Sequence, residues 1–536
     1  MHQRLIASLI AVNIFHLLNG QPIITRQIDA GGSSSDNFRS IEITTDGGFI
    51  AGGFSNSGIS GEKTQASRGG KDYWVIKYDR QGIKQWDKTI GGSADDELYS
   101  VLQTNDGGYL LGGLSWSNIS GEKTQKSKGY CDYWIVKVDS FGTIQWDKTI
   151  GGTDIEFLTS MCKTSDGGYL LGGMSLSNAG FDKTENCRGG YDYWVVKIGR
   201  KGKIDWDKTM GGSQYEYLTS VKQTRDSGII IGGRSFSNAS GEKSQNSRGA
   251  GDYWIVKLNN LHEKEWDKTI GGSQNEFPGN VIQMPDDGYI ICGSSESGVS
   301  GEKSDSSRGY SDYWIVKINK RGTVRWNKTI GGSDLDYAQS VQFTKDSFLI
   351  IGGYSYSGLS GEKSENMRGL SDYWIIKLNT KGQLLWDKTI GGSSYDESVV
   401  IKETGANKYM IGGTSSSIAD YDKTQNSRGE EDFWIVNIQE SGLLKHPIAT
   451  TIGESFPSNS LKAVSSLKLF PTVATSIVNV EAEGLTVVSV FDRHGRMLLR
   501  RTINGASRLN VSGLVPGVYY LKNEQTNAVA RFIIER

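Results

Sequence analysis

Residues 132–152 read DYWIVKVDSFGTIQWDKTIGG, and this stretch decides the fold because close copies of it recur along the chain. The run DYWIVKV is rich in the β-branched and aromatic residues that favour strands, and the turn from Asp139 to Gly142 separates it from a second such run. Apolar residues point to both sides of the run, so we expect this strand to be covered on both faces. The tryptophans of the triplet follow one another at steps of 60 residues: Trp74, Trp134, Trp194, Trp254, Trp314, Trp374 and Trp434.

Each 60-residue unit contains four strand-like runs. In the second copy they span 98–104, 109–114, 132–138 and 143–150, bounded by turns rich in Gly, Asp and Ser. Four short antiparallel strands repeated along a chain are typical of a β-propeller, in which each unit forms one blade and packs against two neighbours. The seven copies predict an all-β, seven-bladed propeller over 21–447. An open β-solenoid, which would expose sheet edges at both ends, is the alternative.

The two ends of the repeat region are complementary. Residues 21–32, QPIITRQIDAGG, align with the fourth run of the first unit at 81–92, and no first three runs precede them. The last unit has its first three runs, but its fourth, SGLLKHPIATTI at 441–452, is degenerate and contains Pro447, which lacks the N–H of a strand ladder. We therefore expect residues 22–30 to supply the fourth strand of the last blade and close the ring.

The repeats resemble the bacterial seven-bladed β-propeller repeat family. The resemblance rests on GGSxxD at the start of each unit, on a central glycine pair such as Gly112-Gly113, on DYWIVKxD and on the terminal KTIGG, and it covers residues 21–447. It implies the propeller fold and no particular activity.

Residues 1–20 have the features of a secretory signal peptide, because Arg4 provides a positive start and the apolar run Leu5–Leu18 follows it. A short membrane anchor is the alternative, but the run is shorter than the about 20 apolar residues of a span, and Asn13 and His16 interrupt it. No other stretch is apolar enough to cross a bilayer as a helix, so we expect no transmembrane helix in the mature chain.

Charge and cysteine content narrow the class of protein. The 536 residues include 59 Lys and Arg and 60 Asp and Glu, a net charge of −1, which provides no basic surface for nucleic acid. The four cysteines lie at different repeat positions without metal-ligand spacing, which argues against a disulfide framework and a metal site: Cys131, Cys162, Cys187 and Cys292. A pair between Cys162 and Cys187 stays open, and no cofactor is predicted.

The 60-residue period stops before the C-terminus. A Ser-rich stretch with Pro457 predicts a linker over 448–466, and residues 467–536 contain short alternating runs and Gly/Pro turns that predict a small β-sandwich.

Residues 467–536 resemble the type A C-terminal sorting domain of the type IX secretion system of Bacteroidetes. The matching motifs are Leu469-Phe470-Pro471, Val490-Phe491-Asp492 with Gly495-Arg496, Leu514 with Gly517-Val518-Tyr519, and the basic and apolar ending at 531–536. Thr472 stands where the family commonly has Asn. The resemblance implies export by Sec, passage through the outer membrane by the type IX machinery as partner, and a place at the cell surface or outside the cell, often with removal of the tail. An ordinary sandwich module is the alternative.

One face of the predicted propeller, here called the long-loop face, carries the loop that precedes each first run and the long loop exemplified by 115–131. The first of these loops contributes an acidic residue in every unit: Asp36, Asp96, Glu156, Glu216, Glu276, Asp336 and Asp396. The long loop contributes a lysine in every unit: Lys63, Lys123, Lys183, Lys243, Lys303, Lys363 and Lys423. A residue repeated in every blade suits support of the blade better than a single reaction, so we interpret the acidic ring as structural; a cation site at the channel mouth is the alternative.

No residue set that carries catalysis stands out, and no catalytic residue is predicted. His2 and His16 belong to the signal peptide, and His262, His446 and His494 lack triad or metal partners in the sequence. The GxSxG, HExxH and P-loop motifs are absent. Carboxylates alone can serve a secreted carbohydrate-active hydrolase or lyase, which is the alternative function.

Binding is the favoured function, because one repeat position on the long-loop face varies while its neighbours hardly do. The middle residue of the SxS motif after the second run is Asn56, Trp116, Leu176, Phe236, Glu296, Tyr356 or Ser416. Exposed aromatic rings stack on sugars and anchor protein contacts, so Trp116, Phe236 and Tyr356 are the candidate ligand-binding residues. Rings packed under the long loop are the structural alternative. We expect a secreted or cell-surface module for binding or scaffolding, with a glycan or a surface protein as ligand.

Overall fold

The computed structural model describes residues 21–440 and parts of the C-terminal segment. Those parts are 468–470, 473–474, 477–492, 497–512, 514–523 and 529–534. The signal peptide expected at 1–20, the degenerate run at 441–452 and the linker expected at 448–466 lie outside the described residues. The chain divides into two compact units, Met1–Leu444 and Lys445–Arg536.

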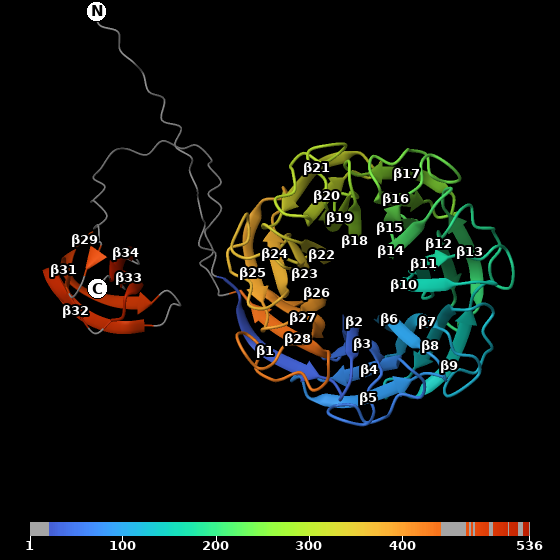
Figure 1. The fold of residues 1–536 in the computed structure, drawn as a ribbon, viewed down its shortest axis with the longest axis horizontal. Coiled ribbons are helices and arrows are strands. Elements are labelled where there is room, and N and C mark those ends of the chain that lie inside the picture. The colour runs from blue at the N-terminus through green and yellow to red at the C-terminus, as the bar shows by residue number, and fades with distance from the viewer. Residues whose placement is uncertain are drawn as a thin grey trace, which may run out of the picture. The chain divides into compact units, whose positions relative to one another are not determined.

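The first unit is a ring of four-stranded antiparallel sheets around a central opening (Figure 1). Six sheets follow the chain from the centre outward: β2(Asp36–Ile43) to β3(Phe49–Ser55), β4(Asp72–Tyr78) and β5(Lys84–Ile90); β6(Asp96–Gln103), β7(Tyr109–Ser115), β8(Asp132–Val138) and β9(Ile144–Ile150); β10(Glu156–Lys163), β11(Tyr169–Ser175), β12(Asp192–Ile198) and β13(Ile204–Met210); β14(Glu216–Gln223), β15(Ile229–Ser235), β16(Asp252–Leu258) and β17(Lys264–Ile270); β18(Glu276–Gln283), β19(Tyr289–Ser295), β20(Asp312–Ile318) and β21(Val324–Ile330); β22(Asp336–Phe343), β23(Leu349–Ser355), β24(Asp372–Leu378) and β25(Leu384–Ile390). A further sheet has the order β1(Ile23–Ala30), β28(Asp432–Gln439), β27(Lys408–Ser415) and β26(Asp396–Gly405). The described residues contain no helix, and the architecture is that of a β-propeller, as the repeat predicts.

The third strand of each sheet is buried on both faces, as its sequence predicts. In β8 every residue is buried. The Trp134 ring lies in one apolar cluster with Tyr73 and Val75 of the preceding blade, and the centroids of the Tyr73 and Trp134 rings are 5.0 Å apart. The Tyr73 hydroxyl also donates a hydrogen bond of 2.9 Å to the Trp134 carbonyl oxygen. The repeated tryptophans therefore lie between blades and join each blade to the one before it.

Strand β1 completes the last sheet, as the alignment of residues 21–32 predicts. It pairs antiparallel with β28, which places Ile28 opposite Ile435 and Ala30 opposite Phe433. The first and last propeller strands in the chain are thus neighbours in one blade, and their pairing closes the ring.

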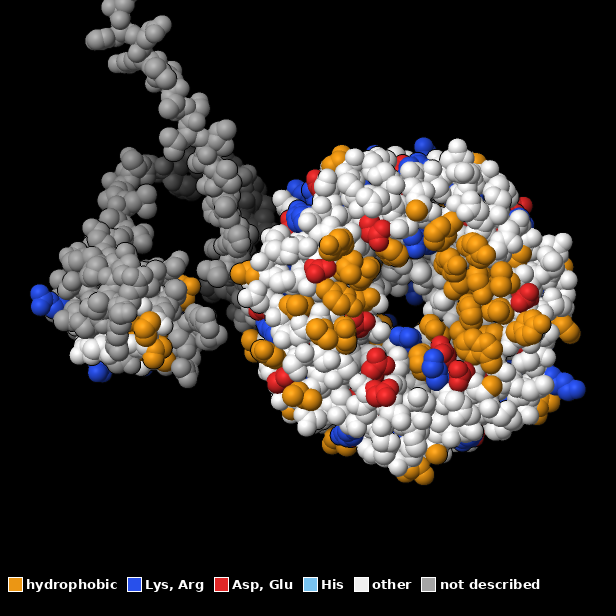
Figure 2. Space-filling view, viewed as in Figure 1, with side chains coloured by type: hydrophobic (Ala, Val, Ile, Leu, Met, Phe, Trp, Pro, Cys, Tyr) orange, Lys and Arg blue, Asp and Glu red, His pale blue; other side chains and the backbone are white. Residues whose placement is uncertain are grey.

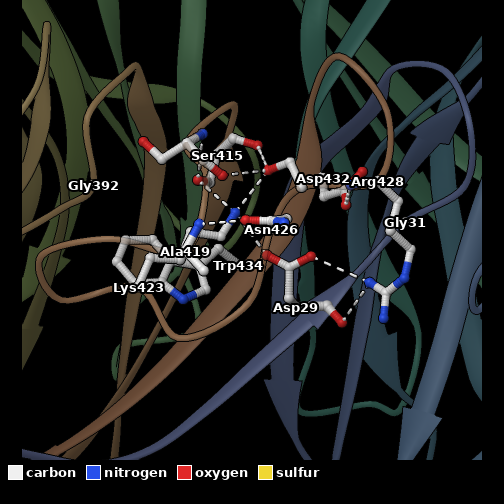
Figure 3. A network of polar contacts seen from close by, with 12 residues as sticks. Asp29, Gly31, Gly392, Ser415, Ala419, Lys423, Asn426, Arg428, Asp432 and Trp434 are labelled. Atoms are coloured by element: carbon white, nitrogen blue, oxygen red, sulfur yellow. Dashed lines mark hydrogen bonds and ion pairs between the residues drawn. The ribbon is translucent and has the colours of Figure 1, made fainter.

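A buried ion pair holds the closing strand in place (Figure 3). Lys423 Nζ lies 2.7 Å from Asp29 Oδ2, and both side chains are almost fully buried. In the first blade the matching lysine, Lys63, donates instead to the hydroxyl oxygen of Thr89 at 2.7 Å. Arg428 adds a second cation, with its Nη1 atom 3.3 Å from Asp29 Oδ1. The closing blade therefore uses an ion pair at the position where the first blade uses a neutral hydrogen bond.

The second unit contains six strands joined in one hydrogen-bonded sheet. They are β29(Lys468–Phe470), β30(Val473–Ala474), β31(Ile477–Asp492), β32(Met497–Asn510), β33(Gly517–Asn523) and β34(Val529–Ile534). The long strand β31 pairs with β29, β32 and β33, and the short strand β30 runs parallel to β34. Val488, Val490, Leu521 and Phe532 belong to the apolar core of this unit.

Candidate ligand-binding face and central cavity

The acidic ring lies at the start of the innermost strands, and its carboxylates are buried. Asp36 Oδ2 accepts hydrogen bonds from the Gly32 N–H at 2.6 Å and from the Ser57 hydroxyl at 3.0 Å. The corresponding glycine N–H donates to the carboxylate in every other blade, to Asp96, Glu156, Glu216, Glu276, Asp336 and Asp396. Each carboxylate therefore binds the backbone of the loop that leads into its own blade.

A second acidic series, at the start of the third strands, faces this ring across each blade boundary. Burial, together with the charge of Asp96 in the next blade, raises the pKa of Asp72 to about 6. Burial also raises the pKa of Glu276 to about 7, with an added contribution from a hydrogen bond to Asp252. The Oδ1 atoms of Asp72 and Asp96 are buried and have no hydrogen-bond partner among the described residues. Two such facing carboxyl groups are set up to share a proton.

The repeated basic residues are also buried or form ion pairs with residues of neighbouring blades. Lys63 is buried, and burial lowers its pKa to about 8. Arg68 Nη2 lies 2.6 Å from Glu122 Oε1 of the next blade, and Arg428 Nη2 lies 2.7 Å from Glu62 Oε1 across the closing boundary. In the part of the chain that the structure describes, no group of three or more His, Cys, Asp or Glu side chains is arranged to hold a metal ion.

The three candidate aromatic residues lie on the long-loop face of alternate blades. Trp116 is 37% exposed, whereas Phe236 and Tyr356 are half-buried. The Tyr356 hydroxyl donates a hydrogen bond of 2.5 Å to Glu397 Oε1, and burial together with this carboxylate raises the pKa of Tyr356. The structure thus leaves the Trp116 ring accessible and holds the other two rings partly beneath their neighbours.

A row of aromatic rings connects Trp116 with Phe236 across three blades. Consecutive ring centroids in the order Trp116, Phe157, Tyr191, Tyr217 and Phe236 are separated by 6.0, 5.8, 5.9 and 6.0 Å. Figure 2 shows hydrophobic side chains gathered around the central opening, most densely over the blades of β10–β17. We refer to these five residues as the aromatic row.

Sequence analysis missed Phe157, Tyr191 and Tyr217, although a signal was present. Phe157 and Tyr217 follow the acidic residue of the first strand, where the other copies have Asn37, Glu97, Phe277, Tyr337 or Glu397. This position varies between copies, although less than the SxS position does. The repeat pattern could single out these positions, but the contact between residues of adjacent blades depends on the assembled ring.

A string of polar groups borders the aromatic row. The Arg234 guanidinium lies 4.5 Å from the Phe236 ring centroid and 4.3 Å from that of Phe277. Its Nη2 atom donates to Asn275 Oδ1 at 2.5 Å, and Asn275 Nδ2 donates to Glu296 Oε2 at 2.8 Å. The aromatic row therefore lies beside paired hydrogen-bond donors and acceptors.

A central cavity of about 450 Å³ lies inside the ring of innermost strands and is lined by all of them. The aromatic residues Tyr99, Phe277, Tyr337 and Tyr354 contribute to its wall. Its only charged lining residues are Arg39, Glu42, Lys222 and Lys402, so the cavity contains a single carboxylate among the described residues.

The four cysteines are free thiols, so Cys162 and Cys187 form no disulfide. Burial raises the pKa of Cys187 to about 11, which makes it a poor nucleophile near neutral pH. Among the described residues, no helix has the length and apolar character needed to span a membrane.

Comparison with known proteins gives different results for the two units. A region of 231 residues is 23% identical to the regulatory protein FlaEY of Caulobacter vibrioides, and it covers 40% of this chain and 24% of FlaEY. The chain therefore spans about a quarter of that relative's length. A solved structure of a protein of unknown function from Dyadobacter fermentans is 10% identical with a TM-score of 0.39, covering 64% of this chain and 93% of that one. The WD40 domain of Neurospora crassa Pan2 is 10% identical with a TM-score of 0.40, covering 77% and 91%.

Residues 468–535 match the family model of the secretion system C-terminal sorting domain. The match coincides with the described strands β29–β34 and with the motifs that the sequence places at 467–536. The chain therefore carries a type IX C-terminal sorting domain, and the protein is exported to the cell surface or the extracellular space.

Proposed function

We propose that this protein is a non-catalytic binding or scaffolding module that the type IX secretion system delivers to the outside of the cell. In this proposal the sheets form a closed seven-bladed propeller over 21–447, which follows a signal peptide at 1–20. A linker at 448–466 connects it to the β-sandwich sorting domain at 467–536, which contacts the secretion machinery.

The aromatic row and Tyr356 are the proposed ligand site on the long-loop face. The observation that carries this proposal is the contrast between uniform and variable positions. The buried tryptophans and the acidic ring are nearly identical in every blade, whereas the row occupies positions where other blades have apolar, polar or charged residues as well as aromatic ones. Blade structure does not require aromatic rings at these positions, so their presence in neighbouring blades favours a ligand, either a glycan or a surface protein.

The alternative of a carbohydrate-active enzyme receives less support. Glycoside hydrolysis commonly uses two carboxyl groups that flank the scissile bond. The central cavity has an asymmetric set of unlike charges, which is the arrangement expected of an enzyme, but Glu42 is its only carboxylate. The carboxylates of the acidic ring are buried and bind the backbone.

A binding array with the purified mature protein tests the proposal. Glycans and surface proteins of the source cell type would be screened, and each positive ligand would be measured again with Trp116→Ala. We expect weaker binding with an unchanged melting temperature, because the Trp116 ring is exposed. Phe141→Ala is the matched control, since Phe141 is 75% exposed in the turn between β8 and β9 on the opposite face. Equal binding by both variants would show that the ligand binds elsewhere.

A further inference from the structure

The central cavity carries an excess of positive charge that the blade repeat does not explain. The charged groups of its wall are three cations, Arg39, Lys222 and Lys402, and one anion, Glu42. We propose that the cavity binds a compact oxyanion, a carboxylate or phosphate group, between Lys222 and Lys402. This inference is independent of the ligand proposed for the aromatic row.

Lys222 is the cation without a counter-charge. The Lys402 Nζ atom lies 3.3 Å from Glu42 Oε2, so the single carboxylate of the cavity already has a partner. Lys222 lies close enough to Lys402 and Glu42 to interact with both, yet its side chain forms no ion pair or hydrogen bond with any residue that the structure describes. Burial lowers the pKa of Lys222, and Lys402 lowers it further, while Cys162 and Glu42 oppose this shift. A partly buried cation without a counter-charge is unfavourable, and a bound anion would offset that cost.

Arg39 adds a second cation without a carboxylate. Its Nη1 atom donates to the Phe38 carbonyl oxygen at 3.4 Å and to the Ser398 hydroxyl oxygen at 3.1 Å. Its guanidinium also lies over the rings of Phe54 and Tyr99. These partners are neutral, so the wall keeps a net positive charge after the pair between Lys402 and Glu42 is counted.

The blade structure does not require a lysine at the positions of Lys222 and Lys402. The same repeat position holds Leu102 and Ile282 in other blades, which form the same four-stranded sheet. Two lysines that converge on one cavity from β14 and β26 are therefore a feature of this interior and not of the repeat. A cavity of about 450 Å³ has room for an oxyanion and several waters.

Thermal unfolding of the mature protein tests the proposal directly. Melting would be followed at pH 7 in sodium phosphate, in sodium acetate and in sodium chloride of equal ionic strength. We expect phosphate or acetate to raise the melting temperature above the value in chloride, because a ligand that binds the folded state stabilises it. Calorimetric titration with the effective anion should give a dissociation constant that Lys222→Met weakens by at least about tenfold, since a charged hydrogen-bond donor is lost.

Two matched variants separate a site from a general salt effect. Lys163→Met removes the same charge from an exposed position on β10 and should keep the full response. Lys222→Arg retains the charge and should keep most of the binding. In chloride alone, Lys222→Met should melt at a higher temperature than the natural protein, since it removes a cation without a partner. The same response from all variants, or no response beyond chloride in the natural protein, would overturn the proposal.

A uronic acid oligosaccharide distinguishes the source of the anion. If it binds and Lys222→Met abolishes the binding, the site takes an acidic group of a larger ligand. If only the free ions bind in a Lys222-dependent way, the site takes a small anion. Both outcomes support the oxyanion site and identify its ligand.

Discussion

Each repeated tryptophan packs between two neighbouring blades. Trp254 is fully buried, its ring centroid lies 4.8 Å from that of Tyr193 in the preceding blade, and its Nε1 atom donates to Asp267 Oδ2 at 3.0 Å. Truncating it removes apolar contacts on both sides and leaves the Asp267 carboxylate without this donor. The side chain therefore contributes both to the packing between two blades and to a hydrogen bond within its own blade.

We predict that Trp254→Ala lowers the free energy of unfolding by about 3–5 kcal/mol, the usual cost for a large buried aromatic residue. Urea unfolding followed by circular dichroism measures this change. Phe141→Ala is the control, because its ring is 75% exposed and its loss should leave the midpoint nearly unchanged. A midpoint for Trp254→Ala equal to that of the natural protein would exclude the packing between blades.

The facing carboxyl groups predict an unusual dependence of stability on pH. Folding raises the pKa of Asp72 to about 6 and of Asp432 to about 7, from an ordinary value near 4. A carboxyl group whose pKa is raised by folding stabilises the folded state at low pH and loses that contribution as the pH rises through the folded pKa. The urea concentration at the unfolding midpoint should therefore decrease as the pH is raised from 5 to 7. Lys63 stays protonated over this range, because its pKa is about 8.

Asp72→Asn should reduce this dependence. Its amide oxygen can still accept from the Arg68 N–H, as the carboxylate does, and the neutral amide removes the charge that Asp96 opposes. The variant should be more stable than the natural protein at pH 8 and closer to it at pH 5. A urea midpoint that rises from pH 5 to pH 7 in the natural protein would contradict this account.

Strand β1 differs from the fourth strand of the first blade at one position that changes how it binds the neighbouring lysine. Asp29 occupies the position of Thr89 and pairs with the buried Lys423. We predict that Asp29→Ala lowers the free energy of unfolding by about 3–5 kcal/mol, since it leaves the buried Lys423 with the Ser415 and Ser427 hydroxyls but without a counter-charge.

Asp29→Thr is the informative companion variant, because it restores the neutral partner that the lysines of other blades use. It should cost clearly less than Asp29→Ala in the same urea experiment. Removal of residues 22–30 should be more severe still and lead to aggregation, since it exposes the edge of β28. Equal stability of Asp29→Ala and the natural protein would show that the ion pair does not hold the closing strand.

The sequence predicts the elements far better than the ligand face. The run DYWIVKV predicts a strand buried on both faces, and the alignment of residues 21–32 predicts the partner of β28, because both depend on periodicity alone. The aromatic row depends on which loops the ring brings together. Tyr191 lies in the long loop before β12 and Tyr217 lies in β14 of the next blade, so only the assembled ring shows that they form one surface.

The sorting domain determines the fate of the whole molecule. Residues 467–536 placed behind a signal peptide and a reporter should carry the reporter out of a cell with an active type IX system. Protease accessibility on intact cells measures this transfer. A known sorting tail in the same cells is the control, and a reporter retained in the periplasm beside a working control would show that these residues do not suffice for export.

Because β1 pairs with β28, the last blade forms only when both ends of the propeller sequence are present. Trp434 Nε1 donates to Gln27 Oε1 across 407 residues of chain, so the ring closes only after all intervening blades have been synthesised and have crossed the inner membrane. Until then β1 has no partner, and any product that stops before residue 432 keeps an open sheet edge. We expect such fragments to aggregate or to be cleaved more readily than the closed ring. A stable propeller therefore requires a chain that contains both β1 and β28.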